Sequence, residues 1–335
     1  MPRAMKVAVF SAERYDRAFL DAANRRAGHA LHYFQAALDV ETASLAAGHA
    51  AVCIFVNDTA DAAVLERLRR GATGLVALRC TGFNNVDLGA ARRLGIKVVR
   101  VEEYSPYSVA EHTVALLLAV NRKIHRAYNR TRDSNFALDG LMGFDLHGKT
   151  VAVIGTGRIG RVFARIMLGF GCQVIGHDIF PAPEFVALGA RYATPGEIGA
   201  EADIISLHCP LTPDTYHIIN AATLARVKPG ALLVNTSRGG LLDTEAAIAA
   251  LKSGQLGGLA LDVYEQEAGL FFRDLSSTVI TDDVLQRLVS LPNVIVTGHQ
   301  AFFTREAMTT ISETTLRSVT EFANGQPLSH PIAAP

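Results

Sequence analysis

The strongest constraint on this chain is a glycine-rich segment between residues 149 and 178. Residues 151–154 read V-A-V-I, an apolar and partly β-branched run that is typical of a buried parallel strand. Gly155, Gly157 and Gly160 follow with the spacing G-x-G-x-x-G, and apolar residues at helical spacing begin inside this motif. The segment therefore predicts a strand, a tight turn and a helix of a parallel α/β sheet.

Each glycine of this motif has a physical reason. Gly155 permits the tight turn, Gly157 lets a pyrophosphate approach the backbone, and Gly160 lets the helix pack closely on the strand. The first turn of the helix directs its free N–H groups and the positive end of its dipole towards the phosphates. The motif thus predicts a dinucleotide site, and the alternative is a purely structural turn.

A carboxylate at Asp178 refines this prediction. It follows a second apolar strand, residues 172–175, about 20 residues after the glycines, as dinucleotide-binding units require. Asp178 would accept hydrogen bonds from a ribose 2′-hydroxyl and would repel a 2′-phosphate. We therefore expect NAD rather than NADP, unless Asp178 is only a surface residue.

Composition excludes several other classes of protein. The 335 residues suffice for two domains, and 49% hydrophobic with 19% charged residues is ordinary for a globular α/β protein. A net charge of zero gives no reason to expect nucleic acid or a membrane surface as a partner. The four cysteines are scattered without metal-ligand spacing, and no apolar run resembles a signal peptide or a membrane span. We expect a soluble cytoplasmic protein without a metal.

The order of predicted elements indicates two α/β domains. Strands at 6–10, 51–56, 75–78 and 96–101 alternate with helical segments, so the first hundred residues read as a small doubly wound domain. A long helix over 107–131 follows; it either crosses between domains or packs against another subunit, or it is a plain core helix. A final helix over 304–322 ends the chain.

Four later strands each lead into a loop with polar or special residues. These strands are predicted at 204–208, 232–236, 259–263 and 294–297. Ligands of open α/β sheets bind at the carboxyl ends of the strands, at the point where the strand order reverses. The loops after these strands are therefore the expected site.

Three charged residues in these loops suggest a reaction. Arg238 offers a planar fork that matches a carboxylate, and His299 can exchange a proton near neutral pH. Glu267 could hold the far nitrogen of that histidine, although Glu265 competes for this role, and Arg238 could instead be a structural ion-pair partner. Beside a nicotinamide, such a set would bind a 2-oxo acid by its carboxylate and protonate its carbonyl oxygen while hydride arrives at carbon.

Several motifs together resemble the D-isomer-specific 2-hydroxyacid dehydrogenase family. These are the glycine loop, T-S-R-G-G from Thr236, L-D-V-Y-E-x-E from Leu261 and T-G-H-Q-A-F from Thr297. The family usually has proline before the catalytic histidine, where this chain has Gly298. That departure, with segments 267–277 and 297–304, is similar to the bacterial fermentative D-lactate branch of the family.

The resemblance implies a fold and an assembly. The expected fold is α/β with two doubly wound parallel-sheet domains. A Rossmann NAD domain, residues 104–299, would be inserted in a flavodoxin-like substrate domain formed by residues 1–103 and 300–335. Members are commonly homodimers, and homotetramers occur.

The resemblance also assigns roles to individual residues. Arg238, Glu267 and His299 would be catalytic. The substrate would be bound by the backbone amides of Thr81 and Gly82 and by the side chains of Tyr104 and Phe302. NAD would be bound by Gly155, Gly157, Arg158, Ile159, Gly160, Asp178, Cys209, Pro210, Thr215, Thr236, Ser237 and Asp262.

The activity implied is the NAD-dependent, reversible conversion of pyruvate and D-lactate. One alternative is a D-2-hydroxyacid dehydrogenase for a bulkier 2-oxo acid, such as 2-oxoisocaproate or phenylpyruvate, or for hydroxypyruvate. The other is a non-catalytic NAD-sensing regulator, against which the complete set of three charged residues argues.

Overall fold

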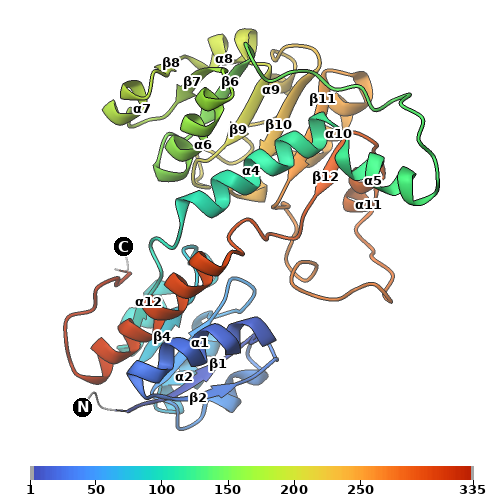
Figure 1. The fold of residues 1–335 in the computed structure, drawn as a ribbon. Coiled ribbons are helices and arrows are strands. Elements are labelled where there is room, and N and C mark those ends of the chain that lie inside the picture. The colour runs from blue at the N-terminus through green and yellow to red at the C-terminus, as the bar shows by residue number, and fades with distance from the viewer. Residues whose placement is uncertain (1–3, 333–335) are drawn as a thin grey trace. The chain divides into compact units, whose positions relative to one another are not determined.

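The computed structural model describes residues 4–332 and divides into two units, each an α/β sheet with its own core (Figure 1). The first unit consists of residues up to Ser105 together with those from Phe303 onward, and the second spans Pro106–Phe302. The chain thus leaves the first unit, forms the second and returns.

The first unit contains a five-stranded parallel sheet. Its strands, in the order β2-β1-β3-β4-β5, are β1 (Lys6–Val9), β2 (Ala30–Tyr33), β3 (Ala51–Ile54), β4 (Leu75–Leu78) and β5 (Lys97–Val99). The helices are α1 (Arg14–Ala27), α2 (Ala62–Arg70), α3 (Leu88–Leu94) and α12 (Arg305–Ala323), with a 3₁₀ turn η1 at Thr42–Ala46. The strand order is that of a flavodoxin-like sheet.

The C-terminal helix α12 completes the core of the first unit. It packs beside α1 on one face of the sheet, as Figure 1 shows. Leu316 and Val319 of α12 are buried in one cluster with Val7, Leu20 and Leu75. Residues that are some 300 positions apart in the chain therefore form one hydrophobic core.

The second unit contains a seven-stranded parallel sheet. The strands are β6 (Thr150–Ile154), β7 (Gln173–His177), β8 (Arg191–Tyr192), β9 (Ile204–Leu207), β10 (Ala231–Asn235), β11 (Leu256–Leu261) and β12 (Val294–Val296). Their order is β12-β11-β10-β9-β6-β7-β8, so the winding reverses between β6 and β9. This is the Rossmann order, and the predicted fold class of two doubly wound sheets is confirmed.

Helices cover both faces of this sheet. They are α4 (Pro106–Asn121), α5 (Ile124–Arg132), α6 (Arg158–Gly169), α7 (Pro183–Ala187), α8 (Pro195–Glu201), α9 (Ala221–Leu224), α10 (Thr244–Ser253) and α11 (Asp283–Ser290), with a 3₁₀ turn η2 at Gly239–Leu241. Along β6, Val151 and Val153 pack in the cluster with α4 and α6, whereas Ala152 and Ile154 belong to the cluster with α9 and α10. A strand buried on both faces explains the continuous apolar run in the sequence.

The prediction of one long helix over 107–131 is wrong in one respect: the structure has two helices there, α4 and α5. The backbone of Lys123 adopts a left-handed conformation with φ of 51°, which interrupts the helix between α4 and α5. Asn121, at the end of α4, bonds the carbonyl and amide of Phe144 instead of continuing the helix. Most of α4 is buried, as expected of a core helix, whereas no residue of α5 is buried.

A buried arginine joins the carboxyl ends of three strands in the first unit. Arg79 follows β4, is 3% exposed, and donates to the Asp16 carboxylate (3.2 Å) and to the carbonyl of Ser11 (2.7 Å). Its guanidinium lies 5.0 Å from the centre of the Phe55 ring. Burial opposes its charge, but Asp16, Cys53 and Asp58 outweigh that effect and raise the pKa of Arg79. The guanidinium therefore stays charged and ties these strand ends together.

Replacement of Arg79 by methionine should strongly destabilise the first unit, because it leaves the Asp16 carboxylate buried without its cation. Breaking a buried ion pair on one side costs about 3–5 kcal/mol. Urea-induced unfolding followed by circular dichroism measures this loss, with Arg92→Met on the exposed face of α3 as the control. A free energy of unfolding within about 0.5 kcal/mol of the wild type would contradict the assignment.

Candidate active site

The carboxyl ends of the central strands of the second unit gather the candidate residues. β9, β10, β11 and β12 are direct neighbours and run parallel, so the loops after them leave the sheet at one edge. These loops begin at His208, Thr236, Asp262 and Thr297. The four strands end within two residues of their predicted ends, and the predicted loops follow them.

The glycine loop after β6 is shaped to receive a phosphate. A Cβ atom on Gly155 (φ 95°) would lie 2.4 Å from the Cys209 amide nitrogen, and one on Gly160 would lie 2.1 Å from the Gly155 carbonyl oxygen. Neither position tolerates a side chain. A Cβ atom on Gly157 would meet nothing within 4 Å, so open space lies before the first turn of α6. The twelve-residue helix α6 begins there with Arg158 and Ile159, and these residues fit a bound pyrophosphate.

Asp178 lies directly after β7 and is bound to the glycine loop. Its Oδ2 atom accepts hydrogen bonds from the amide (2.7 Å) and hydroxyl (3.2 Å) of Thr156, and its Oδ1 atom accepts one from the Phe180 amide (2.9 Å). The carboxylate is half-buried, and its position relative to the glycine loop is fixed by these contacts. Asp178 is therefore a fixed element of the predicted dinucleotide site.

Arg238 lies in the loop after β10, and no carboxylate of the described chain pairs with it. Its guanidinium donates to the carbonyl of Ser237 (2.7 Å), and its own carbonyl accepts from Asn235 (2.8 Å). The next residue, Gly239, has to be a glycine because its backbone lies against Tyr264. A Cβ atom at this position would lie 2.1 Å from the Tyr264 carbonyl carbon. The alternative of a structural ion pair is thus wrong, and the guanidinium is available for an anion.

His299 and Glu267 form a pair. The Nδ1 atom of His299 lies 2.9 Å from the Oε1 atom of Glu267, and the side chains are 18% and 28% exposed. The other oxygen of Glu267 accepts the Tyr264 amide at 3.1 Å, and the Phe272 ring lies 5.7 Å from the histidine ring. The orientation of the imidazole is therefore set on one side, which leaves Nε2 for other partners.

Glu265, the competing carboxylate, has a different partner. Its Oε1 atom lies 2.6 Å from Nε2 of His217 and accepts the Tyr216 hydroxyl at 3.1 Å. This hydrogen bond, followed by burial, raises the pKa of Tyr216. The ambiguity left by the sequence is thereby resolved: Glu267, and not Glu265, binds His299.

A buried carboxylate holds the histidine loop. Asp262 is fully buried and accepts from the amides of Gln300 (2.9 Å) and Ala301 (2.7 Å) and the hydroxyl of Thr297 (2.5 Å). Its carbonyl accepts the His299 amide at 2.7 Å. Together these bonds maintain His299 in a left-handed backbone conformation, φ 55°, which is unfavourable for a non-glycine residue.

His112 on α4 is the further partner of this carboxylate, and the sequence did not reveal it. Its Nε2 atom lies 3.4 Å from Asp262 and 3.2 Å from the Thr297 hydroxyl. Burial opposes ionisation of Asp262, but the bonds from His112, Thr297 and the two loop amides lower its pKa. In the sequence, the one signal was the polar pair Glu111–His112 in a largely apolar helix.

The other predicted cofactor residues lie in the loops after β9 and β10. The Thr236 side chain is buried and bonded to the Thr113 hydroxyl at 2.8 Å, while Ser237 donates to the carbonyl of Cys209 at 2.6 Å. Thr215 donates to the carbonyl of Pro210 at 2.7 Å. The Ser237–Cys209 bond joins the two loops, the Thr236–Thr113 bond ties the second loop to α4, and the Thr215–Pro210 bond lies within the first loop.

Three predicted substrate residues, Thr81, Gly82 and Tyr104, belong to the first unit, and Phe302 is the last residue of the second. Thr81 and Gly82 are half-exposed in the loop after β4. The contributions of these four residues to a substrate site stay predictions.

His208 illustrates why position alone does not identify an acid–base residue. It follows β9 directly, but burial lowers its pKa to about 3, and its ring packs 5.0 Å from Phe163. Its Nε2 atom binds the Ser206 hydroxyl at 2.9 Å. The half-buried imidazole of His208 is therefore neutral near pH 7.

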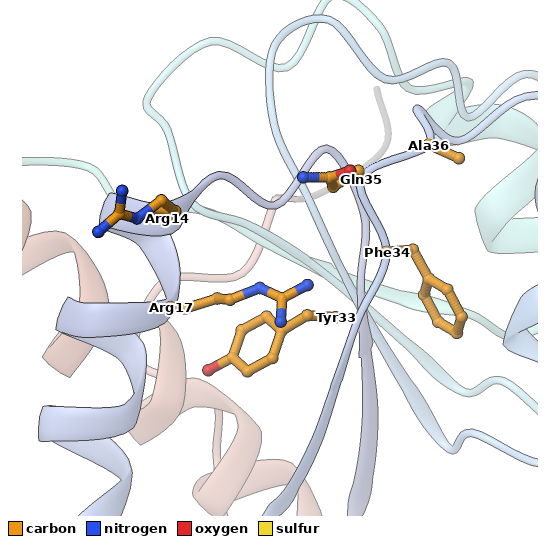
Figure 2. Close-up of a pocket in the computed structure, with 6 residues that line it drawn as sticks. All are labelled: Arg14, Arg17, Tyr33, Phe34, Gln35 and Ala36. Carbon is orange, nitrogen blue, oxygen red and sulfur yellow. The ribbon is translucent and has the colours of Figure 1, made fainter.

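Other surface features do not coincide with the predicted site. A pocket of about 560 Å³ lies in the first unit, where the Arg17 guanidinium lies 5.0 Å from the centre of the Tyr33 ring, but none of the predicted site residues lines it (Figure 2). Between residues 4 and 332 no group of three or more His, Cys, Asp or Glu side chains could hold a metal ion. Within the same range no helix is long and apolar enough to cross a membrane.

Comparison with known proteins identifies the class. Residues 114–301 match the model of the D-isomer-specific 2-hydroxyacid dehydrogenase family, NAD-binding domain. The chain therefore belongs to this family, as its motifs predicted. It is an NAD-dependent oxidoreductase, so the predicted cofactor is also confirmed.

Individual relatives are similar over nearly their whole length. The chain is 52% identical to 2-hydroxyacid dehydrogenase homolog 1 of Schizosaccharomyces pombe over 321 residues, which cover 96% of this chain and 97% of that one. It is 50% identical to the D-lactate dehydrogenase of Escherichia coli over 322 residues, 96% and 98% of the two chains. A solved structure of the pyruvate reductase of Chlamydomonas reinhardtii superimposes with a TM-score of 0.93 at 42% identity, covering 98% of this chain and 99% of the other.

Glu267→Gln should reduce turnover by about 100-fold, because a neutral amide holds the His299 ring less firmly and does not stabilise its protonated form. The matched variant Glu265→Gln changes the contacts with His217 and Tyr216 but none with His299, and it should retain far more activity. Steady-state turnover of both variants checks this difference. Equal losses would show that Glu267 has no special relation to His299.

Proposed function

We propose that this protein reduces pyruvate to D-lactate with NADH and catalyses the reverse reaction. The observation that supports it is the His299–Glu267 pair on the loops of neighbouring strands, together with a guanidinium at Arg238 that no carboxylate neutralises. An acid–base group and an anion site at one sheet edge suit a 2-oxo acid.

The residues of the chain divide the chemical work. Arg238 binds the substrate carboxylate bidentately and polarises the neighbouring carbonyl. In reduction, Nε2 of protonated His299 donates a proton to the carbonyl oxygen, and in oxidation neutral Nε2 removes it. Glu267 keeps Nδ1–H hydrogen-bonded and stabilises the imidazolium. When bound, NAD supplies or receives the hydride at the substrate carbon.

The residues predicted for NAD would hold it. Arg158 and Ile159 would bind the pyrophosphate and Asp178 the adenine ribose. The adenosine half would be bound by Cys209, Pro210 and Thr215, and the nicotinamide half by Thr236, Ser237 and Asp262. Asp262 has a second role here, because its carboxylate also holds the His299 loop.

We propose pyruvate as the preferred 2-oxo acid. The names of two similar proteins, a D-lactate dehydrogenase and a pyruvate reductase, favour pyruvate. Tyr104 and Phe302 would line the space around the substrate methyl group and exclude the bulkier 2-oxoisocaproate or phenylpyruvate. Catalytic efficiencies for a panel of 2-oxo acids, including hydroxypyruvate, test this choice, and absence of turnover with all of them would favour an NAD-sensing regulator.

Arg238→Lys should lower kcat/KM for pyruvate, because an ammonium group cannot form the paired hydrogen bonds of a guanidinium. One charge-assisted hydrogen bond is worth about 1.5–3 kcal/mol, which corresponds to about 10- to 100-fold in rate. Steady-state kinetics with varied pyruvate measures the loss. Wild-type efficiency in this variant would exclude Arg238 as the carboxylate ligand.

Asp178→Ala should narrow the preference for NADH over NADPH, because it removes a ribose acceptor and the repulsion of a 2′-phosphate. The ratio of catalytic efficiencies with the two cofactors is the measurement. Because Asp178 also binds Thr156, the thermal stability of the variant is recorded in parallel. If the ratio stays that of the wild type, another residue discriminates between the two ribose forms.

We also propose that the protein is a homodimer, with a tetramer as the alternative, and that α5 and the segment after it form the contact between copies. Their large apolar side chains are strongly exposed: Ile124 56%, Tyr128 60%, Phe136 74%, Leu138 82% and Met142 86%. Monomers seldom leave such a patch uncovered. The double variant Phe136→Asp, Leu138→Asp should have half the mass of the wild type by light scattering, whereas Val279→Asp, at another exposed position, should not. An unchanged mass in the double variant would exclude this surface.

The proposed compartment is the reducing cytosol. All four cysteines, Cys53, Cys80, Cys172 and Cys209, are free and buried, which suits a reducing environment.

A further inference from the structure

The loop after β4 contains two neighbouring amides without a protein acceptor. Among residues 4–332, neither the Thr81 nor the Gly82 N–H group donates a hydrogen bond, and both residues are half-exposed. Adjacent free amides of this kind form an anion-binding concavity. The residues that fix the direction of these two N–H groups would therefore affect the binding of a carboxylate.

The carbonyl groups of the same two peptides are held by the residues that follow β5. The Val101 amide donates to the carbonyl of Cys80 at 3.2 Å, and Nη1 of Arg100 donates to the carbonyl of Thr81 at 3.2 Å. In a planar trans peptide the N–H group points opposite to the C=O group. Both free amides are thereby directed away from residues 100 and 101, to the same side of the loop.

Arg100 is itself fixed in place. Its guanidinium lies 5.0 Å from the centre of the Phe83 ring and 3.6 Å from the Glu102 carboxylate, and its side chain is 28% exposed. Its backbone amide donates to the carbonyl of His330 at 3.2 Å. These contacts hold the donor against the loop that it orients.

We propose that Arg100 is a positioning residue for substrate binding: it fixes the Thr81–Gly82 peptide so that the Gly82 amide receives the substrate carboxylate. A charge-assisted hydrogen bond on the carbonyl also polarises the peptide, which strengthens its N–H group as a donor. This inference rests on the proposed reduction of a 2-oxo acid, and it assigns a substrate-related role to a side chain that does not contact the substrate.

Three variants test the inference. Arg100→Met removes the guanidinium while keeping an unbranched side chain, Arg100→Lys keeps the charge without the planar fork, and Arg92→Met is the control at an exposed arginine of α3. KM for pyruvate should rise in Arg100→Met on the order of ten-fold, with a smaller change in kcat and none in KM for NADH. Arg100→Lys should restore KM only in part, and Arg92→Met should match the wild type.

The salt dependence of KM distinguishes two roles of Arg100: orientation of the Thr81–Gly82 peptide and long-range attraction of the substrate carboxylate. If Arg100 acts through the peptide, the KM ratio of Arg100→Met to wild type should be the same at about 0.05 M and 0.5 M salt. A ratio that falls to one at high salt, or full restoration by Arg100→Lys, would show long-range attraction and overturn the inference. If Arg100→Met also raised KM for NADH and lowered the melting temperature, Arg100 would have a merely structural role, and the inference would be overturned.

The proposed function is tested separately on the wild type. If the wild-type protein reduces no 2-oxo acid, the proposed function fails whatever Arg100 does. If the wild type is active and Arg100→Met has an unchanged KM for pyruvate and an unchanged affinity for oxamate, an unreactive analogue, only the inference about Arg100 fails.

Discussion

The buried Asp262 carboxylate is the contact on which the histidine loop depends. It accepts three hydrogen bonds from that loop, and its carbonyl accepts the amide of His299, whose backbone is in an unfavourable conformation. A carboxylate with this many donors stays ionised despite burial. The free energy of these bonds offsets the strain, so the imidazole is held in position before any ligand binds.

The fold was largely predictable because local and long-range signals agree. The apolar runs of β6, β9, β10 and β11 are continuous since both sheet faces are buried, and the G-x-G-x-x-G spacing fixes where a helix must begin. Arg238, Glu267 and His299 could be named from the sequence because each follows a strand that its apolar run predicts. Strand β2 was not predicted, because it is a four-residue edge strand whose residues are all exposed or half-exposed.

The remaining features depend on contacts between distant residues, which no local pattern contains. The choice between Glu265 and Glu267 was decided by His217, and the role of His112 appears only once α4 lies beside β11. The break between α4 and α5 follows directly after Asn121, whose buried side chain bonds the distant residue Phe144, and no local pattern shows this contact. Arg79 reads in the sequence as an ordinary charged residue, yet it is buried among carboxylates of the first unit.

The return of the chain to its first sheet has a consequence for synthesis on the ribosome. The core of the first unit includes Leu316 and Val319 of α12, which are translated only after the whole second unit. The second unit, Pro106–Phe302, has all its strands and helices as soon as it emerges. The inserted unit can therefore fold while the chain is still growing, whereas strands β1–β5 keep an open apolar face until α12 has been translated. Of the two units, the one whose strands are made first is the second to complete its core.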